Sequence, residues 1–429
     1  MIKRYCSRHV VLLLPVLAVL LLVIGTRTPL LARASRDRLG PPPPKTVVTS
    51  LAIEDPGGDA MRSFYESLMS TEAGERPGIT RIIHYGDSHV AADLMTGELR
   101  RRLQMGFGDA GPGFIGARPW QRYWPHRVGS TASAGWKTGG VMLSQEADRR
   151  FGLAGVSVES HRSDEWIRVE AACRYFELYL LSQPGGGAVE VILDGQVYRR
   201  RVSLASERAA PAYIEVTARD EGFHTVEIRT ISSGVVRVLG LVVERGGAGV
   251  VYDALGINGA RAGRLLAWDR DVLADNLEHR SPNLIIIAYG SNEVGDADLD
   301  LEEYGRSFSA VLNRLRAAVP RASLLVISPP DRAIRVNGRW QTIPRMAALA
   351  AVQRRAALSA GAAFWDLFRA MGAAGSIQRW ASRTQPLAQP DRVHLTREGY
   401  RLAAEMLYAE LMRGYLWELA LQETDDSCP

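Results

Sequence analysis

Cysteine is scarce in this chain, which has only Cys6, Cys173 and Cys428 among 429 residues. None of them forms a CxxC pair or a Cys/His pattern with the spacing of a zinc site, so we expect no zinc site. Cys6 precedes the N-terminal apolar run and therefore does not resemble a cysteine lipidated after a signal sequence. Cys173 and Cys428 can pair outside the cytoplasm, although only their number favours this.

Nucleotide-binding and nucleic-acid-binding motifs are also missing. The glycine-rich segment 106–116 contains neither GxGxxG nor GK[ST], so we interpret it as a shaped loop rather than a phosphate cradle. The net charge of +5 is spread over arginine-rich segments instead of one basic block. We therefore expect no nucleic-acid partner, while an anionic partner such as a cell wall stays open.

The chain has little long apolar sequence apart from the run Val10–Ile24, which follows the basic residues Lys3 and Arg4. This pattern predicts a signal-anchor or transmembrane segment over residues 1–30. Residues 31–58 include four consecutive prolines and read as a stiff linker. We expect the catalytic part to lie outside the cytoplasm and to contact a membrane through this segment, with a cytoplasmic membrane-anchored enzyme as the alternative.

Two kinds of periodicity divide the rest of the chain. Residues 59–135 and 249–420 alternate strand and helix patterns, which predicts one α/β domain with a parallel sheet. Between them, residues 136–248 show eight short β-type runs separated by turn signals, which predicts an inserted all-β domain of jelly-roll type. Residues 421–429 form a tail.

Ser88 follows the first strand of the α/β pattern. The apolar run Ile82–Tyr85 meets Gly-Asp-Ser-His and then a helical pattern, so Ser88 is placed at a strand-to-helix turn with its hydroxyl exposed. That position suits a nucleophile whose intermediate carries an oxyanion. The alternative is a serine that only caps a helix. Asp87 is expected to be a structural turn acceptor rather than a catalytic acid.

A histidine and a carboxylate occur together much later in the chain. Asp391 and His394 are three residues apart before a helix, so the carboxylate can orient one imidazole nitrogen while the other acts as a base. Asn292 follows the buried strand Leu284–Tyr289. Because carboxyl ends of parallel strands meet at one edge, Ser88 and Asn292 should face one crevice. The alternatives are an ordinary loop histidine and an ordinary turn asparagine.

Four short motifs carry a family resemblance. In chain order they look like blocks I, II, III and V of the SGNH (GDSL-type) hydrolases: Gly86-Asp87-Ser88, Ile257-Asn258-Gly259, Gly290-Ser291-Asn292 and Asp391-Arg392-Val393-His394. The resemblance covers about 81–118 and 251–419, and it implies a flavodoxin-like fold that needs no metal or cofactor. It also implies Ser88 as nucleophile, His394 as base, Asp391 as its orienting acid, and an oxyanion hole made by Ser88, Gly259 and Asn292.

Two details of the resemblance stay open. Gly256 is an alternative to Gly259 for the second oxyanion donor. Glu293 departs from the family pattern, in which many members have Asp after the block III asparagine, and we interpret it as structural.

The inserted β-domain narrows the resemblance to the peptidoglycan O-acetylesterases of Gram-negative bacteria, whose insert resembles a carbohydrate-binding module. This implies an esterase that removes O-acetyl groups from a cell-wall or extracellular polysaccharide in the bacterial periplasm or envelope, anchored to the inner membrane. His89, Trp120 and Trp124 are candidates for substrate contact, and the alternative is that they only pack against neighbouring residues. We interpret His84, inside the first strand, as a buried core histidine.

Two other functions fit the same residues. A polysaccharide O-acetyltransferase would use the same triad and differ only in its acceptor. A non-catalytic glycan-binding envelope protein would keep the fold without turnover, although the complete motif set argues against it.

Overall fold

Runs of buried apolar residues form five parallel strands: β1 (Ile79–Gly86), β11 (Gly249–Gly256), β12 (Leu284–Ala288), β13 (Ser323–Ile327) and β16 (Ala363–Trp365). They are ordered β11-β1-β12-β13-β16, with Ile82 of β1 in register with Tyr252 on one side and Leu284 on the other. Numbered along the chain this is 2-1-3-4-5, an order found in doubly wound α/β sheets, whose strands are apolar because both faces are covered.

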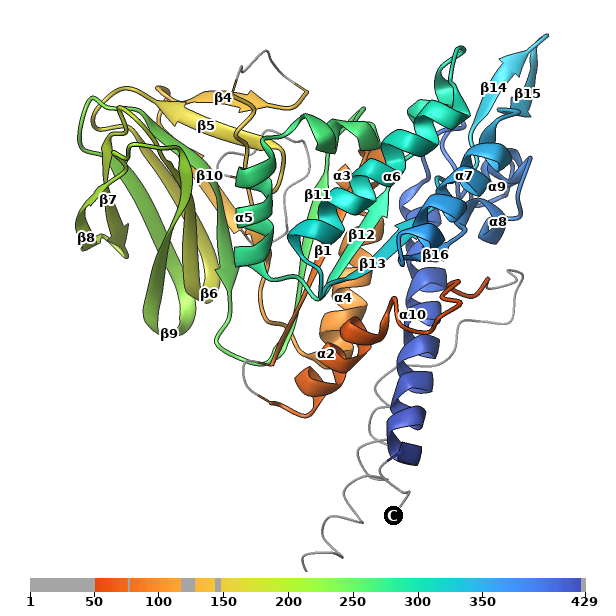
Figure 1. Cartoon of the computed structure of the whole chain (residues 1–429), viewed down its shortest axis with the longest axis horizontal. Coiled ribbons are helices and arrows are strands. Elements are labelled where there is room, and N and C mark those ends of the chain that lie inside the picture. The colour runs from red at the N-terminus through yellow and green to blue at the C-terminus, as the bar shows by residue number, and fades with distance from the viewer. Residues whose placement is uncertain (1–50, 76–77, 117–127, 143–147, 426–429) are drawn as a thin grey trace, which may run out of the picture. The chain divides into compact units, whose positions relative to one another are not determined.

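Helices cover both faces of this sheet in the computed structural model of the chain (Figure 1). One layer consists of α2 (Arg62–Glu72), α4 (Met95–Phe107) and α10 (Arg397–Asp425), and the other of α5 (Arg270–Arg280), α6 (Leu301–Ala318) and α7 (Met346–Ser359). Shorter elements occupy the connections: α3 (Ser88–Ala91), η1 (Ala262–Ala267), η2 (Glu293–Gly295), the β14–β15 hairpin (Ala333–Val336 and Arg339–Thr342), α8 (Leu367–Ala370) and α9 (Ser376–Ala381).

The structure describes residues 51–75, 78–116, 128–142 and 148–425. The predicted segment 1–30 and most of the linker lie outside these ranges. Among the described helices, none is long and apolar enough to cross a membrane. Cys173 is buried in the insert, but Cys428 lies outside the described residues, so their pairing stays a prediction. The helix α10 continues to Asp425, into the stretch predicted as a tail.

The insert is all-β, as its alternating runs predict. Its strands form one connected antiparallel sheet: β2 (Gly113–Ile115), β3 (Val128–Ala132), β4 (Lys137–Gly140), β5 (Val156–Ser160), β6 (Trp166–Ser182), β7 (Ala188–Leu193), β8 (Gln196–Ser203), β9 (Ala210–Thr230) and β10 (Val236–Glu244). The sheet begins before residue 136, because β2 pairs with β10 and β3 pairs with β6.

Two strands of the insert are longer than the sequence pattern suggests. Four predicted runs merge into the paired strands β6 and β9, with a register shift between Cys173 and Tyr175. The apparent break in β6 is the exposed Arg174, and the apparent break in β9 is the polar segment 219–222. Polar side chains interrupt the hydrophobic pattern where the pairing shifts register, but both strands continue through this point.

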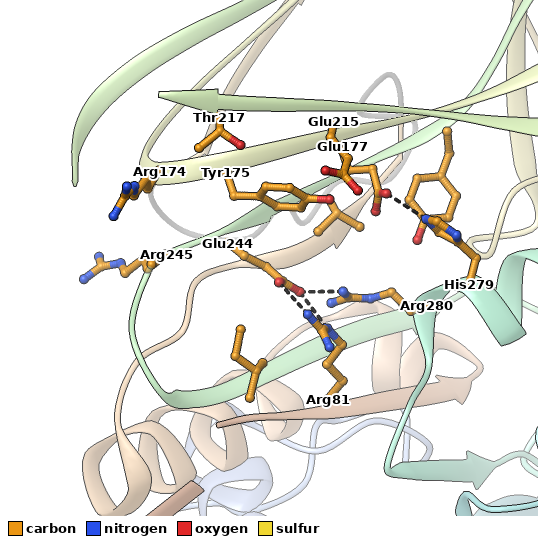
Figure 2. Close-up of a pocket in the computed structure, with 14 residues that line it drawn as sticks. Arg81, Arg174, Tyr175, Glu177, Glu215, Thr217, Glu244, Arg245, His279 and Arg280 are labelled. Carbon is orange, nitrogen blue, oxygen red and sulfur yellow. Dashed lines mark hydrogen bonds and ion pairs between the residues drawn. The ribbon is translucent and has the colours of Figure 1, made fainter. Parts of the chain in front are cut away.

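A buried ion network joins the insert to the parallel sheet (Figure 2). Arg280, 2% exposed at the end of α5, binds Glu244 at 2.5 Å and Asp253 of β11 at 2.8 Å. Arg81 of β1 binds the same Glu244 at 2.8 Å. Burial would raise the pKa of Glu244, but the guanidinium groups of Arg280 and Arg81 lower it to about 2. Glu244 is therefore ionised, and the two arginines neutralise the two carboxylates.

Aromatic contacts reinforce the same junction. Tyr213 of β9 stacks on His279 of α5 with ring centroids 3.5 Å apart, and Tyr179 of β6 packs edge-on against both rings. His279 also shares a 2.7 Å hydrogen bond with Glu177 of β6. The insert is thus packed onto α5 rather than connected only through its two linking chains.

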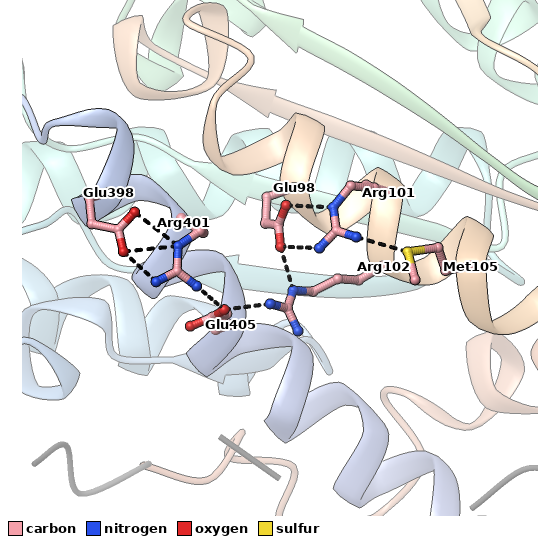
Figure 3. Close-up of polar contacts among 7 residues, drawn as sticks. All are labelled: Glu98, Arg101, Arg102, Met105, Glu398, Arg401 and Glu405. Carbon is pink, nitrogen blue, oxygen red and sulfur yellow. Dashed lines mark hydrogen bonds and ion pairs between the residues drawn. The ribbon is translucent and has the colours of Figure 1, made fainter. Parts of the chain in front are cut away.

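A second ion network ties α4 to α10 (Figure 3). Arg102 of α4 binds Glu405 of α10 at 2.5 Å and Glu98 of its own helix at 2.6 Å. Arg401 extends the network by binding both Glu398 and Glu405. Because α4 follows Ser88 and α10 follows His394, these pairs hold together the two segments that carry those residues.

We expect Arg280→Met to lower the free energy of unfolding by about 3–5 kcal/mol, because it leaves Asp253 and Glu244 buried with too little positive charge. The matched control is Arg306→Ala, whose ion pair with Glu302 is exposed and should be worth no more than about 1 kcal/mol. Urea unfolding followed by circular dichroism measures both. Equal effects of the two substitutions would contradict the importance of the buried network.

Candidate active site

Ser88 is the first residue of α3, directly after β1. Gly86 makes this turn possible, because a Cβ on it would lie 2.3 Å from Val90 Cγ2 and 2.7 Å from the carbonyl oxygen of Ala288. Asp87 caps α3 by accepting the backbone N–H of His89 at 2.9 Å. The tight strand-to-helix turn therefore places the half-buried Ser88 at the carboxyl edge of the parallel sheet.

His394 reaches Ser88 from the loop before α10. Its Nε2 lies 3.0 Å from Ser88 Oγ, and its Nδ1 lies 2.7 Å from Asp391 Oδ2. Asp391 Oδ1 accepts the backbone N–H groups of Val393 and His394 at 2.9 and 3.0 Å, which fixes the loop. The three side chains form one hydrogen-bonded line although 306 residues separate Ser88 from His394.

The charge of Asp391 supports this line. Partial burial would raise the pKa of Asp391, but its hydrogen bond with His394 and the N–H groups of Val393 and His394 lower it overall. The carboxylate is therefore ionised at neutral pH. An ionised acceptor at Nδ1 keeps the proton on that nitrogen and leaves Nε2 free to accept the serine proton.

His89 lies behind His394 instead of at an open surface. It is 8% exposed, its Nδ1 shares a 2.8 Å hydrogen bond with the Tyr400 hydroxyl, and its ring centroid is 5.3 Å from that of His394. Burial, aided by the charge of His394, lowers the pKa of His89 to about 3. The expected substrate contact does not fit this position, since the neighbouring helix α10 covers the side chain. His89 is a neutral support for the His394 ring.

The residues expected to form the oxyanion hole follow the two strands that flank β1, since Gly86 is paired with Gly256 of β11 and with Ala288 of β12. Gly259 sits at an exposed turn with φ of +73°, a conformation that favours glycine. Asn292, at the start of η2, donates one Nδ2 hydrogen to the carbonyl of Ala260 at 2.9 Å, which leaves its second hydrogen for another acceptor. The alternative donor Gly256 is buried beneath α3, where a Cβ would lie 2.1 Å from the Ala91 nitrogen.

Two buried carboxyl groups lie under these loops. Burial is the main cause that raises the pKa of Asp87 to about 7, and the negative charge of Glu293 adds to it. Burial also raises the pKa of Glu293, whose Oε1 accepts the backbone N–H of Ala262 at 2.8 Å. Glu293 therefore connects the loop that carries Asn292 to the loop that carries Gly259, which fits the structural role expected of it.

The sequence reading missed the β14–β15 hairpin, which is attached to the histidine loop. Ala333 donates its N–H to the carbonyl of Arg392 at 3.0 Å, and the Arg392 guanidinium lies over the Trp340 ring, 5.4 Å from its centroid. The available signal was Asn337-Gly338 between two short alternating runs, since both residues have positive φ as in a type I′ turn. Trp120 and Trp124, expected to contact substrate, lie outside the described residues.

A model of the GDSL-like Lipase/Acylhydrolase family matches residues 233–402, which include Asn292, Asp391 and His394. This region therefore belongs to the GDSL-like hydrolase family. The protein is therefore an esterase-type hydrolase. All strands of the antiparallel sheet except β10 precede the matched region and separate it from Ser88. Within the described residues, no group of three His, Cys, Asp or Glu side chains is placed to hold a metal ion.

Solved structures include one that is similar to most of this chain. A structure of a peptidoglycan O-acetylesterase is 25% identical, with a TM-score of 0.70 over 84% of this chain and 98% of that one. A family two carbohydrate esterase from Cellvibrio japonicus is 15% identical, with a TM-score of 0.28 over 68% of this chain and 98% of that one. No curated protein matches the chain.

We expect Asp391→Asn to lower kcat for a small ester by about 10²- to 10⁴-fold with little change in KM, because the amide no longer holds the imidazole in the required tautomer. Asp59→Asn is the control, since Asp59 is an exposed residue paired with Arg62 on the surface. Steady-state kinetics with p-nitrophenyl acetate measures both. Unchanged kcat in Asp391→Asn would remove Asp391 from the proposed triad.

The raised pKa of Asp87 predicts a pH effect on stability. Between about pH 4 and pH 7 the folded protein retains a proton on Asp87 that the unfolded chain releases, so this group's contribution to stability falls as pH rises. Asp87→Asn can still accept the His89 N–H but does not titrate. The stability of this variant relative to the parent should therefore increase across that window, as measured by urea unfolding at several pH values. Parallel pH profiles would contradict the assignment.

Proposed function

We propose that this hydrolase is a serine esterase that removes O-acetyl groups from a cell-wall or extracellular polysaccharide. The observation that carries the proposal is the hydrogen-bonded line from Asp391 through His394 to Ser88, with 2.7 and 3.0 Å between the joined atoms. Similarity to a peptidoglycan O-acetylesterase over 84% of the chain, including the insert, supports an acetylated glycan as the substrate.

The proposed mechanism follows from these contacts. Ser88 Oγ attacks the acetyl carbonyl carbon while His394 Nε2 takes its proton, and Asp391 stabilises the resulting imidazolium. His394 then gives this proton to the departing sugar oxygen, which leaves an acetyl group on Ser88. Water, deprotonated by the same Nε2, attacks the acetyl-enzyme and releases acetate, and the proton returns to Ser88.

The proposed oxyanion hole acts in both steps. The backbone N–H groups of Ser88 and Gly259 and the second Nδ2 hydrogen of Asn292 would stabilise the negative oxygen that forms in each tetrahedral intermediate. Loss of one such donor typically raises the barrier by about 2.7–4 kcal/mol. The bond from Asn292 to Ala260 preorganises this side chain, so no reorientation is needed as charge develops.

The surroundings of the site fit a polymeric substrate. We propose that the core is a flavodoxin-like SGNH domain and that the insert serves as a jelly-roll-like carbohydrate-binding domain. We also propose that the N-terminal apolar run exports the protein to the bacterial periplasm or envelope and anchors it to the inner membrane. The basic residues before Val10–Ile24 support this location.

Acetate release tests the proposal. The parent chain should release acetate from O-acetylated peptidoglycan or an O-acetylated exopolysaccharide, and Ser88→Ala should abolish release because no other group forms the acyl-enzyme. Ser206→Ala, which changes an exposed serine of the insert, is the matched control and should retain full activity.

Three outcomes of that experiment would contradict parts of the proposal. Residual turnover of p-nitrophenyl acetate by Ser88→Ala at the parent's rate would rule out the nucleophile. Turnover of the small ester without acetate release from any polysaccharide would rule out the substrate class. Acetyl transfer to an added oligosaccharide in preference to water would make the protein a transferase with the same triad.

A further inference from the structure

A cavity lies at the other end of the parallel sheet from Ser88. It has a volume of about 500 Å³, is open to solvent, and is lined by β6, β9 and β10 of the insert together with β1 and α5 (Figure 2). Its residues Ile79 and Arg81 begin β1, whereas Ser88 follows the end of that strand. At a rise of about 3.3 Å per residue, roughly 20 Å separates the cavity from the candidate triad. The volume is within the usual range for a small-molecule site.

Most charges in the wall of this cavity are already paired. Glu244 is neutralised by Arg81 and Arg280, and Glu177 shares its 2.7 Å hydrogen bond with His279. These pairs hold the polar side chains of this part of the cavity wall in place. They leave the charges at the two ends of the cavity to decide what it can bind.

Two arginines occupy one end. Arg174 has no ion-pair partner among the described residues, and its Cδ lies 3.0 Å from where a Cβ on Gly246 would stand. Arg245, the neighbour of Gly246, pairs with Asp109 only at 3.5 Å, and its buried Nε has no hydrogen-bond partner within the described structure. Both arginines line this end of the cavity, so their positive charges favour an anion there, and a carboxylate matches the fork geometry of a guanidinium.

Hydrogen-bond acceptors and the ring of Tyr175 line the rest of the cavity wall. Glu177 and Glu215 lie opposite each other on the paired strands β6 and β9, and in the same way Tyr175 lies opposite Thr217. In Figure 2, Tyr175 lies between the arginine end and the glutamate end. Carboxylates can accept several hydroxyl groups, and the face of a tyrosine ring packs against the C–H face of a sugar.

We propose that this cavity binds an acidic sugar residue at a site separate from Ser88. The sugar carboxylate binds Arg174 and Arg245, its ring packs on Tyr175, and its hydroxyl groups donate to Glu177 and Glu215. The proposal does not rest on the esterase mechanism, because it concerns binding and not turnover. It gives the insert and the α/β domain a shared ligand, since β6, β9 and β10 line the cavity together with β1 and α5.

Calorimetric titration with two matched pairs of sugars tests this site. The pairs are glucuronic acid with glucose, and N-acetylmuramic acid with N-acetylglucosamine, in which the first member carries a carboxylate. At least one acidic member should bind about ten-fold or more tightly than its neutral partner, as expected for hydrogen bonds to charged groups. The pair that shows the preference identifies a uronate or a lactyl ether as the source of the carboxylate.

Variants locate the binding. Arg174→Ala and Arg245→Ala should each remove the preference for the acidic sugar, whereas Arg200→Ala, an exposed arginine on β8, should keep it. Arg174 is exposed, so its variant should fold even if Arg245→Ala does not, and a thermal melt checks this. An equal affinity for acidic and neutral sugars, or a preference that survives in Arg174→Ala, would overturn the proposal. The Ser88→Ala variant should keep the same preference for the acidic sugar, so this titration tests sugar binding independently of the esterase mechanism.

Discussion

The buried pairing of Arg280 with Glu244 and Asp253 fixes the point at which the two parts of the chain meet. The chain leaves the parallel sheet near β2, where Phe114 donates its N–H to Asp253 Oδ1 at 2.7 Å, and it returns at the end of β10, where Glu244 binds the same arginine. Both crossing points are therefore attached to one guanidinium. Because unpaired charges are costly in such a dry site, the geometry of the insertion is tightly specified. The candidate active site depends on this, since Ser88 precedes the insert and its partners follow it.

The buried polar side chains next to the candidate active site are largely uncharged. His89 is neutral because burial lowers its pKa to about 3, and Glu293 is shifted toward its protonated form by burial. Asp391 is the ionised group next to His394, so an imidazolium formed there would have an attractive partner on one side and a neutral ring on the other. This arrangement places the stabilising charge where proton transfer needs it, without a competing positive charge at His89.

Much of this architecture could be predicted from sequence because its strongest signals are local. The continuous apolar runs of β12 and β13 indicated buried parallel strands. Ser88 and Asn292 follow the ends of the adjacent strands β1 and β12, and their facing one crevice stays a prediction. The structure also brings Asp391 and His394 to Ser88, while their catalytic roles stay a prediction. The strand β11 was missed because Asp253 interrupts its apolar pattern, and only Arg280, distant in sequence, explains a carboxylate there.

Other features depended on contacts that periodicity does not report. The lengths of β6 and β9 follow from pairing across polar interruptions, and the position of His89 is set by α10, which lies some 300 residues later in the chain. The β14–β15 hairpin had a usable turn signal in Asn337-Gly338, but its attachment to Arg392 could be seen only in three dimensions.

The separation of 306 residues between Ser88 and His394 also has a consequence during synthesis. At about 5–20 residues per second, the ribosome makes the nucleophile roughly 15 to 60 s before its base. Until α10 docks on α4, Ser88 lacks the group that would activate it. A nascent chain would therefore carry a serine without its proposed base, and the proposed chemistry at Ser88 would begin only after both halves of the α/β domain have folded together.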